Sequence, residues 1–246
     1  MTLLVLAAVS FLLSTGVTFG LIRLAGRLHL LDQPNHRSSH SVPTPRGGGI
    51  GFAIVYLLLC VYLLFTAPDF ARVWWVLLVG GGAVALVGLI DDRLNVPSLV
   101  RFAVHAGASA LAVFLLLPLP VVSGLGGLLA VVALVGAWLF VAWSINMYNF
   151  MDGIDGLGGG KAAVTLLAAG VAFTITGSAS LATFSLVLAA AVAGFLVWNW
   201  PPAKVFMGDV GSGLLGFMFG TLALASVHVE GLPVTLLPTL LAPFYI

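Results

Sequence analysis

Charge is scarce in this sequence. Asp, Glu, Lys and Arg make up only 7% of its 246 residues, whereas a soluble globular domain carries about 25% charged residues. Hydrophobic residues account for 61% of the chain. This balance excludes a water-soluble fold, and the formal net charge of +1 gives no support for nucleic-acid binding.

Cysteine is also almost absent. The single residue, Cys60, lies in an apolar run, which excludes a disulfide framework within the chain. We interpret it as a small buried or lipid-facing side chain. The N-terminal apolar segment lacks the pattern of a secretory signal peptide, because Arg23 and Arg27 follow it instead of preceding it. It is therefore interpreted as a first membrane span.

Long apolar runs make up most of the sequence. A spanning helix needs about 20 mostly apolar residues, so the sequence predicts an all-α, polytopic transmembrane helical bundle. Eight full spans are expected at Thr2–Ile22, Gly48–Phe65, Val73–Ile90, Phe102–Leu117, Leu125–Ile145, Ala162–Thr176, Ala182–Val197 and Gly213–Val227.

A ninth apolar run begins near Leu232 and reaches Ile246 after about 15 residues, fewer than a span requires. We therefore expect residues 1–246 to be a single integral-membrane domain that is truncated at its C-terminal end.

Basic residues gather on one side of the predicted bundle. Counted by alternating connections, one side holds eight Lys and Arg residues and the other holds only Arg72. By the positive-inside rule the basic side faces the cytoplasm, which places the N-terminus outside. Six aspartates also fall on this side, so we expect function there. The basic residues are Arg23, Arg27, Arg37, Arg46, Arg93, Arg101, Lys161 and Lys204, and the aspartates are Asp32, Asp91, Asp92, Asp152, Asp155 and Asp209.

This distribution argues against a transporter. Transporters place ionisable residues within their spans near the midplane, whereas the predicted spans contain no Asp, Glu, Lys or Arg, and His105 is their only ionisable candidate. No repeat relates the two halves of the chain. A purely structural bundle would not need so many aspartates in its inner loops. A transporter or flippase for a lipid-linked sugar and a structural protein are kept as competing hypotheses.

The first polar segment, Asp32–Gly49, combines basic side chains with a glycine run. Arg37, His40 and Arg46 suit phosphate or carboxylate groups. The three glycines that end the segment open a helix, and we expect their free backbone N–H groups to face an anion. The alternative is a basic loop that only sets membrane topology.

The second polar segment contains adjacent carboxylates, Asp91 and Asp92, at the end of a span. Adjacent carboxylates repel each other unless a cation neutralises them, and acidic residues at a helix C-terminus oppose the helix dipole. Mg²⁺ held by one or two carboxylates together with substrate phosphates would explain the pair. The alternative is a solvated helix end paired with Arg93 and Arg101.

Two further segments carry carboxylates among glycines. Asp152 and Asp155 are three residues apart and share a face on a helix or tight turn, but their segment lacks the ligand spacing of an EF-hand. Asp209 precedes a span, with Lys204 five residues earlier, and the glycines around it do not form a dinucleotide-binding fingerprint. Together, the four segments predict a site for phosphate and metal.

The combination of motifs resembles a known family. Asp91-Asp92, the run from Asn146 through Asn149 to Asp152-Gly-Ile-Asp-Gly156, and Asn199 followed by Val205-Phe-Met-Gly-Asp-Val-Gly-Ser212 are similar to the polyprenyl-phosphate N-acetylhexosamine-1-phosphate transferases of the glycosyltransferase 4 family. The family includes the translocase that makes the first lipid-linked peptidoglycan precursor and enzymes that initiate O-antigen synthesis. Its fold is a bundle of about ten or eleven spans with the N-terminus outside, which agrees with the side of the N-terminus inferred above from the basic residues.

The resemblance implies that an oxygen of undecaprenyl or another polyprenyl phosphate attacks the β-phosphorus of a UDP-N-acetyl amino sugar, and that UMP leaves. Two polyanions must meet in line, so a metal and basic residues have to offset their repulsion. Mg²⁺ is the implied ion, with Mn²⁺ as the alternative. The implied catalytic residues are Asp91, Asp92, Asp152 and Asp155; the metal ligands are Asp209, Asn199, Asp91 and Asp92; and the substrate-binding residues are Arg37, His40, Arg46, Asn146, Asn149, Asn199 and Lys204.

Two features depart from the family pattern. The family carries a later His-rich cytoplasmic motif that would lie beyond Ile246, so an inactive fragment of the transferase is a further alternative. The first loop, Pro43–Gly49, is closer to the O-antigen-initiating branch, which favours UDP-GlcNAc, UDP-FucNAc or UDP-QuiNAc as donor. The implied location is the bacterial inner membrane. A homodimer, and the choice between a one-step and a covalent phospho-aspartate mechanism, are left open.

The charge asymmetry generates a prediction about topology. Single cysteines at Ser39, Ser98 and Ser212, in a Cys60→Ser background, should resist an impermeant external thiol reagent in sealed cells because their loops face the cytoplasm. Opened membranes are the control, since they show which of these cysteines the reagent can reach from the inner side. Labelling of any of them in sealed cells would contradict the span assignment.

Overall fold

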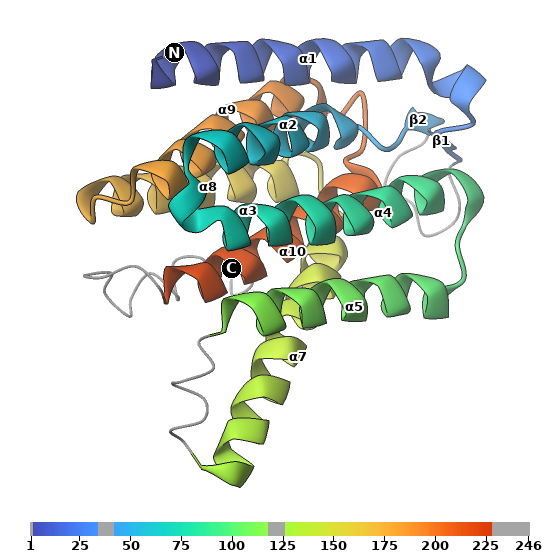
Figure 1. Ribbon diagram of the computed structural model, residues 1–246. Helices are drawn as coiled ribbons and strands as arrows, with labels where there is room; N and C mark the ends of the chain where they lie inside the picture. Colours follow the sequence, from blue (N-terminus) through green and yellow to red (C-terminus); the bar gives the residue numbers. More distant parts are fainter. Residues whose placement is uncertain (1, 34–41, 118–125, 228–246) are drawn as a thin grey trace.

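The computed structural model describes residues 2–33, 42–117 and 126–227. In this part of the chain seven helical segments are long and apolar enough to cross a membrane, which confirms the predicted all-α transmembrane bundle (Figure 1). They are α1 (Leu3–Leu28), the continuous segment Pro68–Leu94, α5 (Ser98–Leu116), α7 (Gly127–Met151), α8 (Leu157–Ile175), α9 (Ala179–Asn199) and α10 (Gly208–Ser226).

The second predicted span corresponds to a shorter helix, α2 (Ile50–Thr66), which is apolar but has only 17 residues. The ninth run and the expected truncation lie outside the described residues. Two short antiparallel strands, β1 (Leu31–Asp32) and β2 (Thr44–Pro45), join α1 to α2. The pairing places Leu31 opposite Pro45 and Asp32 opposite Thr44.

Several helices continue past their predicted ends. α7 extends beyond Ile145 to Met151, and α10 begins at Gly208 instead of Gly213. Asp91 and Arg101, which were expected in loops, likewise lie on helices that continue past the predicted ends of the spans. The predicted bounds follow the apolar residues, which end at the membrane surface. The helices extend further because their backbone hydrogen bonds continue beyond that surface.

α10 is the central helix of the bundle and is buried along most of its length, from Val210 to Ser226. It packs against α7 and against α4 (Gly82–Leu94). A Cβ atom at Gly216 would lie 2.5 Å from the carbonyl oxygen of Ser144 on α7. Small residues let transmembrane helices approach this closely, since lipid gives no hydrophobic drive for helices to associate.

α1 covers one side of the bundle, over α9 and α2, whereas α7 projects beyond α5 on the opposite side (Figure 1). The α1–α9 contact also depends on a glycine, because any side chain at Gly194 would collide with the carbonyl oxygen of Phe11. The indole nitrogen of Trp198 donates a hydrogen bond to the Thr15 carbonyl oxygen at 3.0 Å. A close backbone contact and a polar side-chain bond thus hold α1 in place.

The segment Pro68–Leu94 changes helical form along its length. It contains the 3₁₀ turn η1 (Pro68–Phe70), α3 (Ala71–Val76), the π turn η2 (Leu77–Gly81) and α4. The hydroxyl of Tyr56 on α2 donates a hydrogen bond to the Leu77 carbonyl oxygen at 2.7 Å. A side chain inserted at this point is a recognised cause of an irregular helical turn.

The contact between α7 and α10 yields a stability prediction. Gly216→Ala should destabilise the protein by about 1–3 kcal/mol, as overpacking of a tight core usually does, because the new methyl group meets α7 backbone. Gly107→Ala on α5 is the matched control, since its Cβ would meet nothing within 4 Å. Thermal unfolding of both variants in detergent measures the difference. Equal melting temperatures would contradict the packing described here.

Candidate active site

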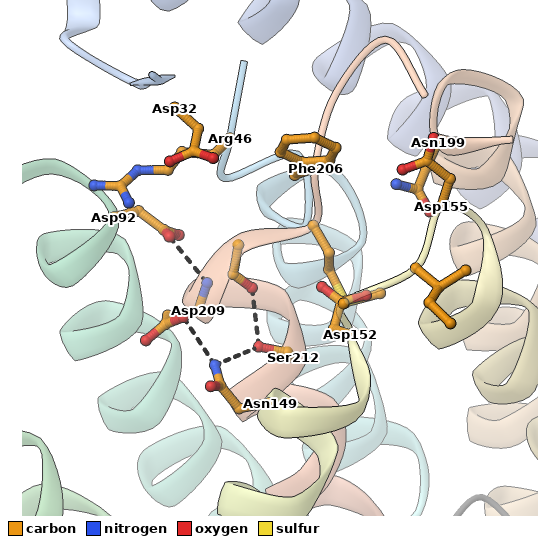
Figure 2. Close-up of a pocket in the computed structure, with 14 residues that line it drawn as sticks. Asp32, Arg46, Asp92, Asn149, Asp152, Asp155, Asn199, Phe206, Asp209 and Ser212 are labelled. Carbon is orange, nitrogen blue, oxygen red and sulfur yellow. Dashed lines mark hydrogen bonds between the residues drawn. The ribbon is translucent and has the colours of Figure 1, made fainter. Parts of the chain in front are cut away.

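The structure brings residues from all four polar segments together at one end of the bundle. They line a cavity of about 330 Å³ where α4, α7 and α9 end and α10 begins (Figure 2). Its lining side chains include Asp32, Arg46, Asp92, Asn149, Asp152, Asp155, Asn199, Phe206, Asp209 and Ser212. Arg37 and His40 lie outside the described residues.

Asp92 forms the N-terminal cap of α10. Its Oδ1 accepts a hydrogen bond from the Asp209 N–H at 3.0 Å, and its Oδ2 accepts one from the Val210 N–H at 3.2 Å. The residue is only 3% exposed. A carboxylate is favourable at a helix N-terminus, so the α10 dipole offsets the unfavourable position of Asp92 near the end of α4.

Glycines make this cap sterically possible. Gly208 has a φ of +76°, and a side chain there would collide with the Asp92 carboxylate. Gly88 on α4 faces α10, where a Cβ would lie 2.5 Å from the Asp209 carbonyl oxygen. Only residues without a side chain let α4, α10 and the carboxylate come this close.

The glycine run of the first polar segment does not leave its amides free. Gly48 and Gly49 donate backbone hydrogen bonds to the carbonyl oxygens of Phe206 and Met207, each at 2.9 Å. Phe206 N–H in turn donates to the Pro45 carbonyl oxygen at 2.8 Å. The expectation that Gly48 and Gly49 present free N–H groups to an anion is therefore wrong. Their amides join the first polar segment to the loop before α10.

Arg101 on α5 lies between two carboxylates. One guanidinium nitrogen, Nη1, is 2.7 Å from Asp91 Oδ2 and 2.7 Å from Asp209 Oδ2. The other Asp91 oxygen accepts the Val96 N–H at 2.6 Å. A single cationic nitrogen thus holds the two carboxylates together. Without it the two carboxylates would repel each other. From the sequence, Arg101 was predicted only to contribute to membrane topology or to pair with Asp91 and Asp92, and its contact with Asp209 was not predicted.

Asn149 holds the second oxygen of Asp209. Its Nδ2 donates to Asp209 Oδ1 at 2.8 Å and to Ser212 Oγ at 2.9 Å (Figure 2). Ser212 Oγ donates to the Gly208 carbonyl oxygen at 3.0 Å. The orientation of Asp209 is therefore fixed from two sides. Ser212 was not predicted as a site residue, although its position one turn after Asp209 on α10 places both on one helical face.

Asn199 connects two loops of the site. Its Oδ1 accepts the Gly156 N–H at 3.1 Å, and its Nδ2 donates to the Val205 carbonyl oxygen at 2.9 Å. Asp155 Oδ2 accepts the Ala203 N–H at 2.9 Å, which ties the same loops together. Both side chains therefore position the cavity wall, while metal binding by Asn199 remains a prediction.

Asp152 lies just after α7, in the wall of the cavity. Burial raises its pKa well above the usual range of an aspartate, and the nearby carboxylates of Asp209, Asp92 and Asp155 raise it further. Burial and like charge both disfavour the ionised form. A cationic ligand or metal in the cavity would oppose both effects.

A second cavity, of about 260 Å³, adjoins the first. Arg101, Phe102 and His105 line it from α5, and Asn146 lines it from α7. Asn149 and Asp209 line both cavities, so the two spaces meet at these side chains. Lys204 lines neither space; its ammonium lies 5.4 Å from the ring centroid of Trp198.

The donor set at the junction fits Mg²⁺ bound together with substrate. Asp209 supplies carboxylate oxygens at the junction and Asn149 adds an amide, while Asp91 lines neither cavity and is joined to Asp209 through Arg101. Within the described residues no three His, Cys, Asp or Glu side chains form a ready metal cage. Mg²⁺ commonly uses one or two carboxylates and completes its shell with phosphates and water, so such a cage is not required.

Comparison with known proteins connects this geometry to a family. Residues 74–227 match the model for glycosyl transferase family 4. This range contains Asn149 and Asp209, which line both cavities, together with Asp91, Asp92 and Arg101.

Curated relatives are similar over most of the chain. Decaprenyl-phosphate N-acetylglucosaminephosphotransferase from Mycobacterium leprae is 33% identical over 232 residues, which cover 85% of this chain and 56% of the relative. Undecaprenyl-phosphate alpha-N-acetylglucosaminyl 1-phosphate transferase from Escherichia coli (strain K12) is 31% identical over 228 residues, 84% of this chain and 58% of the relative. A probable undecaprenyl-phosphate N-acetylglucosaminyl 1-phosphate transferase from Bacillus subtilis is 28% identical over 214 residues, which cover 84% of this chain and 58% of the relative.

The chain thus spans a little over half the length of these curated relatives. The family model, however, matches more than half of this chain and includes the whole junction between the cavities. The chain therefore belongs to glycosyl transferase family 4.

Proposed function

We propose that this chain forms the membrane-embedded core of an enzyme that transfers an N-acetylhexosamine 1-phosphate from a UDP-sugar to a polyprenyl phosphate. The observation that carries the proposal is the junction of two cavities at Asn149 and Asp209, next to the Asp91–Arg101–Asp209 ion pairs. The names of the relatives describe N-acetylglucosamine phosphate transfer to decaprenyl or undecaprenyl phosphate. UDP-GlcNAc is accordingly the proposed donor.

The larger cavity is the proposed site of the nucleotide sugar. Arg46 lines it, and the buried Nε of this residue has no hydrogen-bond partner within the described residues. A buried donor without a partner is costly in a folded protein, and a diphosphate oxygen would satisfy it. Phe206 adds an aromatic ring at the same cavity, and nucleobases stack readily on such rings.

The smaller cavity is the proposed site of the acceptor phosphate. Arg101 supplies a cation there, while Phe102 on the same helix is 51% exposed and apolar. A charged side chain beside an exposed apolar surface suits a phosphate attached to a long hydrocarbon chain in the bilayer. Asn146 and His105 complete the polar part of this cavity.

At the junction the two phosphates would meet in line. An oxygen of the polyprenyl phosphate forms the new bond to the donor β-phosphorus, the bond from that phosphorus to the bridging oxygen breaks, and UMP leaves with the bridging oxygen. Asp91 and Asp209 would hold Mg²⁺, which supplies positive charge against the phosphate oxygens when bound. Arg101 and Asn149 each donate a hydrogen bond to Asp209. The Asp209 carboxylate is therefore already oriented before the substrates react.

The packing below the site weighs against a flippase. A flippase would move its lipid head group through the bundle, yet α10 is buried by apolar residues and glycines from Val210 to Ser226 beneath the cavities. The transferase requires only that both substrates reach one membrane surface. We propose that this surface is cytoplasmic and that the membrane is the bacterial inner membrane, in keeping with the arginine and lysine distribution.

Removing the negative charge of Asp209 tests the proposed metal site. In the complete gene product, Asp209→Asn should reduce UMP release from UDP-GlcNAc and undecaprenyl phosphate by about 100-fold or more, as loss of a preorganised electrostatic group usually does. It should also raise the Mg²⁺ concentration needed for half-maximal activity. Asp69→Asn, in η1 at the other end of the bundle, is the matched control. A normal rate with an unchanged Mg²⁺ titration would remove Asp209 from the metal site.

Neutralising Arg101 tests the ion pairs at the junction. Arg101→Gln should reduce UMP release by about 100-fold or more, because Asp91 and Asp209 lose their shared cation and the acceptor loses its proposed phosphate partner. Arg93→Gln is the control, since Arg93 is an exposed arginine on the neighbouring helix end. Its rate should stay within about twofold of the parent. Equal losses in both variants would indicate a general effect of surface charge.

A further inference from the structure

An apolar groove of about 510 Å³ lies outside both cavities, along the first turns of α8. One wall comes from α8 and the other from the turn that follows α9. The residues used in the argument below are Leu157, Gly160, Lys161 and Val164 on α8, and Trp200 and Pro201 on the turn. The groove begins beside the proposed donor cavity, since Ile154 and Asp155 line both spaces.

The two walls are tied together in the absence of any ligand. The carboxylate of Asp155 accepts the Ala203 N–H at 2.9 Å, and Asn199 Oδ1 accepts the Gly156 N–H at 3.1 Å. A Cβ at Gly156 would lie 3.1 Å from the ring of Pro201, so the backbone there packs directly on the turn. The groove is therefore a preformed feature and does not need a ligand to open it.

The groove has the dimensions and character of a hydrocarbon site. Its floor is open at Gly160, where an added Cβ would meet nothing within 4 Å. Val164 is 68% exposed and Trp200 is 66% exposed, so two large apolar side chains border the groove. A concave, apolar surface on a membrane-spanning helix suits the acyl chain of a lipid.

Lys161 provides the charge at the membrane-surface end of the groove. Within the described residues the Lys161 side chain has no hydrogen bond and no ion pair. A lysine near a helix end places its stem along apolar surface and its ammonium at the head-group level. Tryptophan, here Trp200, is enriched at the same level. The acidic residue of the lining, Asp155, is directed to the Ala203 amide and does not pair with Lys161.

We propose that this groove is a binding site for an anionic glycerophospholipid, with its phosphate at Lys161 and one acyl chain between α8 and Trp200. The polyprenyl acceptor is assigned to the other side of the site, at Arg101 between α5 and α7. The proposal depends on the groove and its cation alone. The lipid site can therefore be tested separately from the proposed transfer reaction.

Brominated lipids test the proposal because bromine quenches tryptophan fluorescence at contact. The complete gene product is placed in nanodiscs that contain brominated phosphatidylglycerol or brominated phosphatidylcholine in an unbrominated background. The described chain has six tryptophans, so the signal of Trp200 is taken as the difference between the parent protein and Trp200→Phe. Half-quenching should require about fivefold less phosphatidylglycerol than phosphatidylcholine, the factor expected for one basic side chain near an anionic head group.

Two variants assign the effect to the groove. Lys161→Gln should reduce the fivefold preference to about one, because the amide has no charge. Gly160→Leu should remove most Trp200-dependent quenching by both lipids, since the new side chain fills the open floor. Gly136→Leu on α7 is the matched control, because Gly136 is exposed and also has open space around its Cβ.

Three results would overturn the proposal. The first is equal quenching of the parent protein by the two lipids, and the second is an unchanged preference in Lys161→Gln. The third is relief of the quenching by undecaprenyl phosphate at a much lower mole fraction than by unbrominated phosphatidylglycerol, which would assign the groove to the acceptor. Loss of folding is recognised separately, because Gly160→Leu and Gly136→Leu should share the melting temperature of the parent protein.

Discussion

The site depends first on the cap that Asp92 provides for α10. This buried carboxylate accepts the N–H groups of Asp209 and Val210, the second and third residues of the helix, and fixes α4 against α10. Asp209 is the first residue whose amide is bound in this way, so the cap also sets the place of the Asp209 side chain. Both cavities meet at that side chain. A buried carboxylate is tolerated here because backbone donors and the helix dipole satisfy it.

Charge balance around the cap explains why the site can hold several carboxylates in a chain of so little charge. One nitrogen of Arg101 contacts both Asp91 and Asp209 and so reduces the repulsion between them, and Asn149 supplies a neutral donor to the remaining Asp209 oxygen. Asp152 has no such cation, and burial with neighbouring carboxylates raises its pKa. The Asp152 carboxyl therefore holds its proton more readily than an ordinary aspartate, and a cation in the larger cavity would favour its ionised form. A metal with a polyphosphate ligand, as proposed here, would stabilise the ionised form of Asp152, and the phosphate would give a partner to Arg46 Nε, which has none within the described residues.

Glycine has a structural role in this bundle that its sequence pattern did not reveal. The run ending the first polar segment looked like an open anion site, yet Gly48 and Gly49 donate to the loop before α10. Gly216 allows α10 to reach α7 backbone, as a central helix in a lipid environment requires. In each case the partner of the glycine lies far along the chain, so local sequence could not distinguish ligand binding from packing.

The sequence by itself determined the all-α membrane bundle, because the energetic requirement for about 20 apolar residues per span is local and strong. It also identified Asp91, Asp92 and Asp209 as candidates, since clustered carboxylates are rare and costly in so apolar a chain. Only the tertiary structure decided their roles. Asp92 became a helix cap, Arg101 joined the other two, and Asn199 became a connection between loops. These roles arise from contacts between residues distant in sequence, whose geometry is set by helix packing and not by residue type or spacing.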